Sequence, residues 1–156
     1  MNFRAQAAQK FPCFRVIDAQ GNLVNKKYEN AVEKEKLIKI FEKMIEINEV
    51  DITFNQAQRQ SRISFYMTCT GEEAAGVASA AALKDVDLIF PQYREAGALL
   101  WRGYTIDEMA NQLTGNKYDP GKGKQMPVHY GSKALNYVTV SSPLATQIPQ
   151  ASGSGY

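Results

Sequence analysis

The chain has 156 residues, 44% hydrophobic and 22% charged, a balance that is typical of a folded domain rather than a disordered segment. Eighteen Lys and Arg against sixteen Asp and Glu leave a net charge of +2, too small to indicate nucleic acid or an acidic membrane surface as a partner. No apolar stretch approaches the roughly 20 residues of a transmembrane helix. Two distant cysteines and one histidine exclude a disulfide framework and a multi-histidine metal site within this chain.

The start of the chain predicts an extension ahead of the main domain. Residues 1–12 carry two basic side chains and no acid, a composition found both in mitochondrial presequences and in frayed termini. Residues 13–18 have the pattern of a short strand, ended by the turn sequence of residues 19–22. We therefore expect residues 1–32 to form an N-terminal extension and residues 33–156 to form the main domain.

Two helices are predicted in the first half of the main domain. Apolar residues recur near the helical period from Glu33 onward, and the polar run 55–62 ends the pattern. Small residues dominate the segment 74–83, which predicts a buried helix that another backbone approaches closely. Thr70 and Glu73 have the spacing of a capping box at its start.

The second half predicts an alternation of strands and helices. Residues 86–90 predict a strand, and residues 95–101 predict a helix. A further helix should begin with the capping box of Thr105 and Glu108 and end at Gly115.

The last part of the chain predicts a loop, a strand and a helix. Residues 115–133 are rich in Gly and Pro without periodicity, and so long a loop is usually functional or mobile. Residues 136–140 predict a strand, and Ser142 with Pro143 predicts a helix start. The element order is that of an α/β fold, with too few strands for a complete doubly wound sheet.

Two polar segments are candidate binding sites. Tyr93 and Arg94 directly follow a predicted strand, and a guanidinium fork suits a phosphate group. Alternatively, Arg94 is a surface residue paired with Glu95 or Glu72. Hydroxyls and carbonyls in residues 141–147 can surround a monovalent cation, and free amides at a helix start favour an anion. The alternative there is an ordinary capped helix.

The loop with Lys122, Lys124 and His129 offers less chemistry. It lacks the Walker phosphate-loop pattern, and the chain contains no GxGxxG. A lone histidine between Val128 and Tyr130 is typical of a hydrogen-bonded structural residue. Without a Ser/His/Asp or Cys/His set, nucleophilic hydrolysis has no support.

Four blocks of this sequence, in the same order, resemble the alpha subunits of the branched-chain 2-oxo acid dehydrogenases, and the similarity extends from about Phe11 to the last residue. The blocks are residues 62–68 (RISFYMT), 92–97 (QYREAG), 121–131 (GKGKQMPVHYG) and 141–150 (SSPLATQIPQ). The resemblance implies the N-terminal part of a thiamine-diphosphate-binding, Rossmann-like α/β fold that is helix-rich and truncated.

The resemblance also implies roles for individual residues. Tyr93, Arg94 and Ser142 match contacts to the cofactor diphosphate, and Leu144 matches an apolar wedge that holds the cofactor bent. Gln92 matches a position at the cofactor that also faces the substrate, and Phe65 matches a substrate-lining position. A potassium site is implied for Ser141, Pro143, Thr146 and Gln147.

The implied activity is oxidative decarboxylation of branched-chain 2-oxo acids, with acyl transfer to a lipoyl group on an acyltransferase core. The implied partner is a beta subunit in an α2β2 heterotetramer, in the mitochondrial matrix or, for a bacterial protein, in the cytoplasm. The magnesium-binding motif and the catalytic histidine loop of the family are expected downstream, so we expect no catalytic residue here and no activity from this chain alone. Alternatives are a pyruvate- or acetoin-type subunit, and a non-catalytic fragment that only docks onto a beta subunit.

Overall fold

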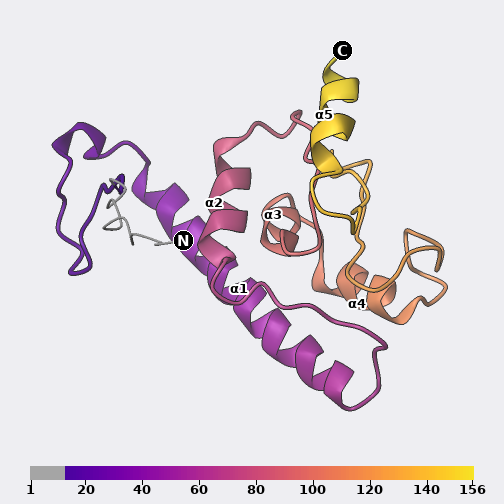
Figure 1. Cartoon of the computed structure of the whole chain (residues 1–156). Coiled ribbons are helices and arrows are strands. Elements are labelled where there is room, and N and C mark those ends of the chain that lie inside the picture. Colours follow the sequence, from indigo (N-terminus) through magenta and orange to yellow (C-terminus); the bar gives the residue numbers. More distant parts are fainter. Residues whose placement is uncertain (1–12) are drawn as a thin grey trace, which may run out of the picture. The chain divides into compact units, whose positions relative to one another are not determined.

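The computed structural model describes residues 13–156, so the basic segment 1–12 lies outside the described residues (Figure 1). The chain divides between Lys36 and Leu37 into two compact units. No helix within the described range is long and apolar enough to cross a membrane. The helical elements are η1 (Lys26–Tyr28), α1 (Lys34–Arg59), α2 (Glu73–Ala82), α3 (Ala96–Trp101), α4 (Ile106–Thr114) and α5 (Gln147–Gly155).

The first unit contains a tight turn organised by Asp18. Its carboxylate accepts hydrogen bonds from the backbone N–H groups of Gln20 and Asn22, at 2.9 and 2.8 Å. The side-chain hydrogen bond from Asn22 is the main reason that the pKa of Asp18 lies below its usual value. The chain turns back at once, so the strand predicted over residues 13–18 is wrong and only the antiparallel bridge between Ile17 and Leu23 forms.

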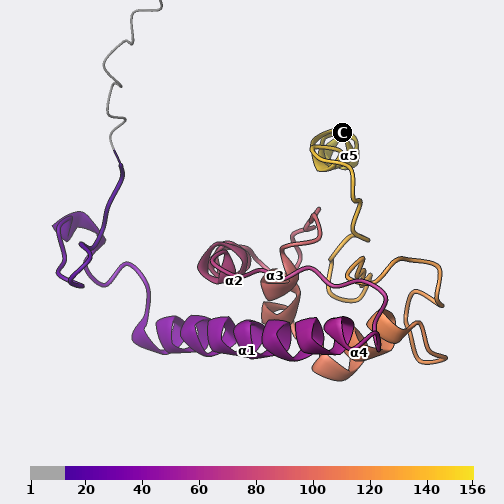
Figure 2. The same ribbon diagram turned by 60° about the horizontal axis from the view of Figure 1, so that its bottom comes forward.

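The helix α1, which belongs to the second unit from Leu37 onward, is long and has α2 and α3 on the same side of it (Figures 1 and 2). It ends at Arg59, inside the polar run that was expected to end it. Ser61 then takes a left-handed conformation (φ 61°), and the N–H of Arg62 donates to Ala57 O at 2.9 Å, which closes the last turn.

The small residues of α2 allow close packing against α3, as the sequence predicted. Gly76, Val77, Ala80 and Ala81 are buried on this helix. A Cβ at Gly97 of α3 would lie only 3.0 Å from Val77 Cγ2. Because side chains rarely approach so closely, a larger residue at Gly97 would have to displace the Val77 side chain.

The capping box predicted at Thr70 is wrong. Glu72 occupies the N-cap of α2 without a side-chain cap bond. The carboxylate of Glu73 instead accepts from Gly71 N at 2.9 Å and from Asn48 Nδ2 at 3.1 Å. The bond from Glu72 N to Cys69 O closes a turn that includes Thr70, so Thr70 lies before the N-cap of the helix.

The capping box predicted for α4 is confirmed. The Thr105 hydroxyl accepts from Glu108 N, and the Glu108 carboxylate accepts from Thr105 N at 2.8 Å. The helix ends at Gly115, whose left-handed conformation (φ 59°) suits a C-cap.

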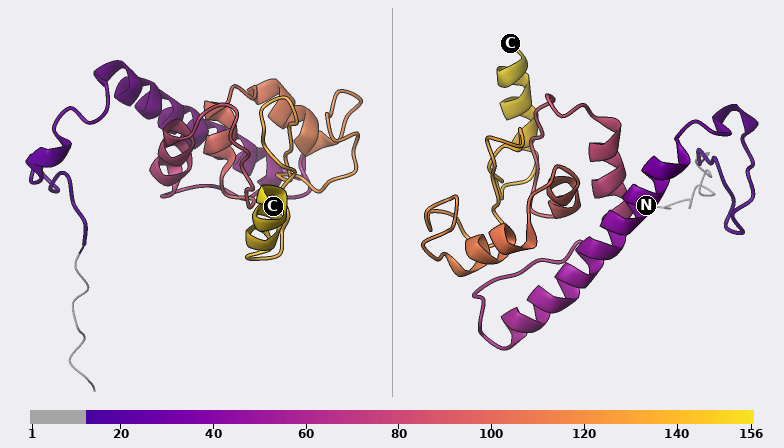
Figure 3. Two further views of the ribbon diagram at one scale, coloured as in Figure 1. Left: turned by 90° about the horizontal axis from the view of Figure 1, so that it is seen from above. Right: turned by 180° about the vertical axis from the view of Figure 1, so that it is seen from behind.

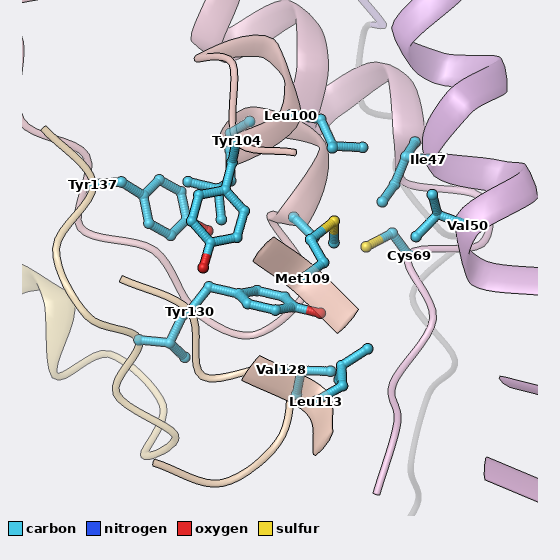
Figure 4. Close-up of a cluster of buried hydrophobic side chains, with 14 of the residues drawn as sticks. Ile47, Val50, Cys69, Leu100, Tyr104, Met109, Leu113, Val128, Tyr130 and Tyr137 are labelled. Atoms are coloured by element: carbon cyan, nitrogen blue, oxygen red, sulfur yellow. The ribbon is translucent and has the colours of Figure 1, made fainter. Parts of the chain in front are cut away.

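Side chains from α1, α3 and α4 form the core of this unit with aromatic residues from the later loop (Figure 4). Ile47, Leu100 and Met109 are fully buried, and the rings of Tyr130 and Tyr137 complete the cluster. Core residues from the segment 128–140 fix that loop against the helices, although it contains no helix or strand.

The strands predicted over residues 86–90 and 136–140 are also wrong, although the pairing between them exists. Ile89 N donates to Asn136 O and Val138 N donates to Ile89 O, both at 2.9 Å, which makes a single parallel bridge between Ile89 and Tyr137. Pro91 has no N–H to extend the ladder, and Asn136 leaves the extended conformation (φ 52°). The described residues are therefore helix-rich, with isolated bridges where the α/β expectation had strands.

Arg102 holds these two segments together. Its guanidinium donates to four backbone carbonyls, those of Lys84, Asp85, Asp87 and Leu135, at 2.8 to 3.2 Å. Only arginine can bind four carbonyls in this way, because its planar guanidinium carries five N–H donors.

The helix start predicted at Ser142 and Pro143 is wrong as well. The helix α5 begins at Gln147 with Thr146 as N-cap, and it projects away from α2, α3 and α4 (Figure 3). Ala145 has a left-handed conformation (φ 64°), which a helix cannot contain, so helical backbone can form only after it. Residues 141–146 are therefore a turn.

We expect Gly131→Ala to destabilise the second unit by about 2 kcal/mol, because overpacking at a rigid contact forces the backbone apart. A Cβ there would lie 2.4 Å from Thr139 Oγ1 and 2.9 Å from Thr139 Cα. Gly153→Ala, at a position with open space on α5, is the matched control and should be neutral or stabilising. Urea unfolding of both variants measures the effect, and equal midpoints would contradict it.

Candidate functional site

Residues 91–95 and the turn of residues 141–147 lie side by side and are joined by two glutamine side chains. Gln147 Nε2 donates to Pro91 O at 3.1 Å and to Ser141 O at 2.8 Å. Gln92 Nε2 donates to Ser142 O at 3.3 Å. The structure therefore brings together the two polar segments that the sequence analysis singled out separately.

Tyr93 and Arg94 lie at the edge of this junction. Tyr93 is half-buried against the core, and the Arg94 guanidinium carbon is 5.8 Å from the centre of its ring. Arg94 Nη1 is 3.9 Å from the Glu72 carboxylate, with 41% of the arginine side chain exposed. Glu95 accepts a hydrogen bond from Gln92 N instead. So long and exposed an ion pair is weak, and it leaves guanidinium donors available to a ligand.

Ser142 and Leu144 are exposed on the turn, and Leu144 is 76% exposed. An apolar side chain this exposed on a short turn has no packing role within the described residues. The Ser142 hydroxyl is hydrogen-bonded to Nε2 of His129. The histidine expected to be structural is thus hydrogen-bonded, and its partner is one of the candidate site residues.

Three oxygen atoms converge within the turn. Thr146 Oγ1 lies 3.0 Å from Ser141 Oγ and 2.9 Å from Pro143 O, so both oxygens are possible acceptors for its single proton. The amide nitrogen of Gln147 faces Ser141 O. The cluster has the oxygen chemistry that a monovalent cation requires, after the Thr146 hydroxyl and the Gln147 amide rotate to present lone pairs.

Phe65 lies elsewhere: it is half-buried and packs against the hydrophobic core. Beside the junction is an open cavity of about 360 Å³, lined mainly by residues of α2, α3, the segment 89–95 and the turn of residues 141–147. Its lining includes Ser79, Ile89, Gln92, Glu95, Ala145 and Gln147.

Residues 22–156 match the family described as the dehydrogenase E1 component. The chain belongs to this dehydrogenase E1 component family. Among its relatives is the 2-oxoisovalerate dehydrogenase subunit alpha 1, mitochondrial, of Arabidopsis thaliana, which is 52% identical over 150 residues, 96% of this chain and 32% of the relative. The mitochondrial 2-oxoisovalerate dehydrogenase subunit alpha of Homo sapiens is 52% identical over 145 residues, 93% of this chain and 33% of that protein. The corresponding Caenorhabditis elegans protein is 51% identical over 145 residues, 93% of this chain and 34% of that protein.

The chain therefore spans about a third of the length of these E1 relatives. The resemblance found in the sequence is confirmed at the level of the family, and it covers both site segments. Sequence patterns alone missed the contribution of His129, since it depends on a contact between residues 13 positions apart.

Proposed function

We propose that this chain is part of the alpha subunit of a branched-chain 2-oxo acid dehydrogenase, the component that oxidatively decarboxylates its substrate and passes the acyl group to lipoyl. One observation carries the proposal: Gln92 and Gln147 join the segment that contains Tyr93 and Arg94 to the turn that contains Ser142. Residues 33–156 are then the N-terminal part of a Rossmann-like thiamine-diphosphate-binding domain, preceded by the extension 1–32.

The donor set fits the diphosphate of this cofactor. A guanidinium and two hydroxyls, on Arg94, Tyr93 and Ser142, are groups that bind phosphate oxygens. Leu144, on the same turn, would serve as the apolar wedge that holds the cofactor bent, which agrees with its exposure of 76%. Gln92 is proposed to contact the cofactor and to face the substrate, and Phe65 is proposed to line the substrate side although it packs against the core in this chain.

Potassium is proposed to bind the oxygen cluster of Ser141, Pro143, Thr146 and Gln147. Pro143 contributes its carbonyl oxygen, because its side chain has no polar atom. A cation there would draw the turn together and hold Ser142 and Leu144 in place. Loss of potassium should therefore weaken binding of the cofactor as well as lower the stability of the turn.

When bound, thiamine diphosphate supplies the carbon nucleophile that makes decarboxylation accessible. The residues of this chain bind and orient it and exclude water on one wall of the site. The Mg²⁺ ligands are proposed to lie outside this chain. A beta subunit completes the site in an α2β2 heterotetramer that serves a lipoyl acyltransferase core in the mitochondrial matrix.

The test is an assay of the full-length alpha subunit, assembled with its beta subunit, on several 2-oxo acids. The highest kcat/KM should be for branched-chain 2-oxo acids. Preference for pyruvate would indicate the pyruvate-type enzyme instead, and preference for acetoin the acetoin-type enzyme. Absence of turnover with any of these substrates would favour a subunit that only docks.

We also expect no release of carbon dioxide from a labelled branched-chain 2-oxo acid by the 156-residue chain alone. The chain provides one wall of the proposed site and none of the acid–base groups of the reaction. Release of labelled carbon dioxide above the level of a buffer blank would contradict this expectation. The assembled full-length enzyme is the positive control.

A further inference from the structure

His129 connects the loop of residues 126–130 to the candidate site. Its imidazole is buried, with 7% of the residue exposed. One ring nitrogen, Nε2, is hydrogen-bonded to Ser142 Oγ, and the other, Nδ1, is 3.0 Å from Pro127 O. Both nitrogens are therefore engaged, and one of the two partners is the hydroxyl proposed to bind the diphosphate.

The loop that carries His129 is held in a strained conformation. Val128, a β-branched residue, has φ 65°, a conformation that costs about 1 to 3 kcal/mol and persists only where its surroundings impose it. The buried amide of Gln112 on α4 donates to Met126 O at 2.7 Å and accepts from Val128 N at 3.1 Å. His129 N also donates to Met126 O, at 3.1 Å. The position of the imidazole is thus fixed from α4.

The hydrogen-bond chemistry gives each nitrogen a direction. A carbonyl oxygen can only accept, so Nδ1 carries a proton and donates to Pro127 O. In the neutral imidazole Nε2 then has a lone pair, and the Ser142 hydroxyl donates to it. In that state Ser142 has only lone pairs left to offer, which is unfavourable toward an anion.

We propose that His129 is a positioning residue that sets the direction of the Ser142 hydroxyl, and that anion binding at Ser142 is accompanied by uptake of one proton from solvent at Nε2. The protonated Nε2 donates to Ser142 Oγ, which releases the hydroxyl proton to donate to a phosphate oxygen. No other bond forms or breaks. The inference rests on the proposed function, since the anion is the diphosphate of the cofactor.

The other titratable groups around His129 do not compete for this role. His129 lines a cavity of about 520 Å³ together with Tyr104, Asp119, Lys124, Lys133 and Tyr137. Burial raises the pKa of Tyr104 to about 12 and that of Tyr137 well above its ordinary value, so both stay neutral. The imidazole is hydrogen-bonded to Pro127 O and Ser142 Oγ, and neither the carboxylate nor the two ammonium groups is hydrogen-bonded to it within the described residues.

The experiment measures binding of thiamine diphosphate to the assembled full-length α2β2 enzyme, stripped of cofactor, by calorimetry. The proteins are the wild type, His129→Gln, Ser142→Ala and the double variant, at about pH 6.5 and about pH 8. Titration in two buffers of different ionisation enthalpy counts the protons taken up. The diphosphate also changes its protonation over this pH range, but that contribution to binding is the same for all four proteins. Differences between the proteins therefore report the contribution of His129.

The wild type should lose more affinity than His129→Gln as the pH rises, by up to about tenfold per pH unit, the limit for one linked proton. Ser142→Ala, which leaves the buried imidazole in place, should also lose the extra proton uptake. In the Ser142→Ala background the histidine substitution should have no further effect on Kd, because the group through which it acts is gone.

Equal proton uptake by the wild type and Ser142→Ala would overturn the inference. So would an equal loss of affinity from His129→Gln in both backgrounds, which is the behaviour of a merely structural residue. If the wild-type enzyme fails to bind thiamine diphosphate at all, the proposed function is overturned, and the inference with it. The two failures are therefore distinguishable.

Discussion

Asp51→Ala is expected to lower the free energy of unfolding by about 3 kcal/mol, because it leaves two buried donors without an acceptor. Asp51 lies on α1, 2% exposed. Its carboxylate accepts from Tyr66 OH at 2.8 Å and from Cys69 N at 2.5 Å. These bonds tie the segment before α2 to α1, so their loss should loosen the helix junction as well as the local turn.

Urea unfolding measures this loss. Asp85→Ala removes the carboxylate of an exposed residue and is the matched control, with an expected change within about 0.5 kcal/mol. Similar unfolding midpoints for the two variants would show that the buried carboxylate contributes little.

The same residue should make stability depend on pH. Burial is the main cause that raises the pKa of Asp51, against the opposing hydrogen bonds from Cys69 and Tyr66. Because the folded-state pKa lies above the ordinary value of 3.8, the folded chain binds the proton more tightly than the unfolded chain. The stabilisation due to that proton is present below pH 3.8 and is lost as the pH rises through the folded-state pKa.

Asp51→Asn isolates this effect, since an amide cannot ionise there. The stability of the wild type relative to Asp51→Asn should fall as the pH rises above 3.8. Urea unfolding at several pH values gives the difference, in which contributions from other titrating groups cancel. A difference that grows with pH would contradict the assignment.

The helices of this protein could be predicted because their signals are local. Thr105 and Glu108 are three positions apart and satisfy each other's backbone N–H groups, so their capping box forms as predicted. The small residues of α2 likewise indicated a close helix crossing, which Gly97 and Val77 make with α3. The strand predictions were wrong because strand formation is not local. A strand needs a neighbour along its length, and Pro91 and Asn136 limit the pairing of these two segments to one bridge.

The candidate site depends on contacts between distant residues. Gln147 reaches Pro91, 56 positions earlier, and His129 reaches Ser142. The sequence pattern predicts Ser142 as a helix N-cap, whereas in the structure its hydroxyl is hydrogen-bonded to the imidazole of His129. The left-handed conformation of Ala145 delays the start of helical backbone until α5. Local propensity cannot predict this outcome, because a long-range hydrogen bond competes with the cap for the same hydroxyl.

Arg94→Gln is expected to weaken binding of thiamine diphosphate by about 10- to 100-fold, since a charge-assisted hydrogen bond contributes about 1.5 to 3 kcal/mol. The prediction rests on the proposed function and on the segment of Arg94, which Gln92 joins to the Ser142 turn. Arg94→Lys should give an intermediate loss, because an ammonium keeps the charge without the planar fork. Calorimetry on the assembled full-length enzyme measures Kd for each variant, and Arg59→Gln, on the exposed end of α1, is the control.

The alternative role for Arg94, a surface ion pair with Glu72, makes a different prediction. The pair is 3.9 Å long and exposed, so breaking it from either side should change stability by less than about 1 kcal/mol. Glu72→Gln removes a carboxylate that competes with phosphate for the guanidinium, and binding should then stay unchanged or become tighter. If Glu72→Gln and Arg94→Gln instead weaken binding equally, the ion pair itself is what the site requires, and the assignment of Arg94 as a direct phosphate ligand is wrong.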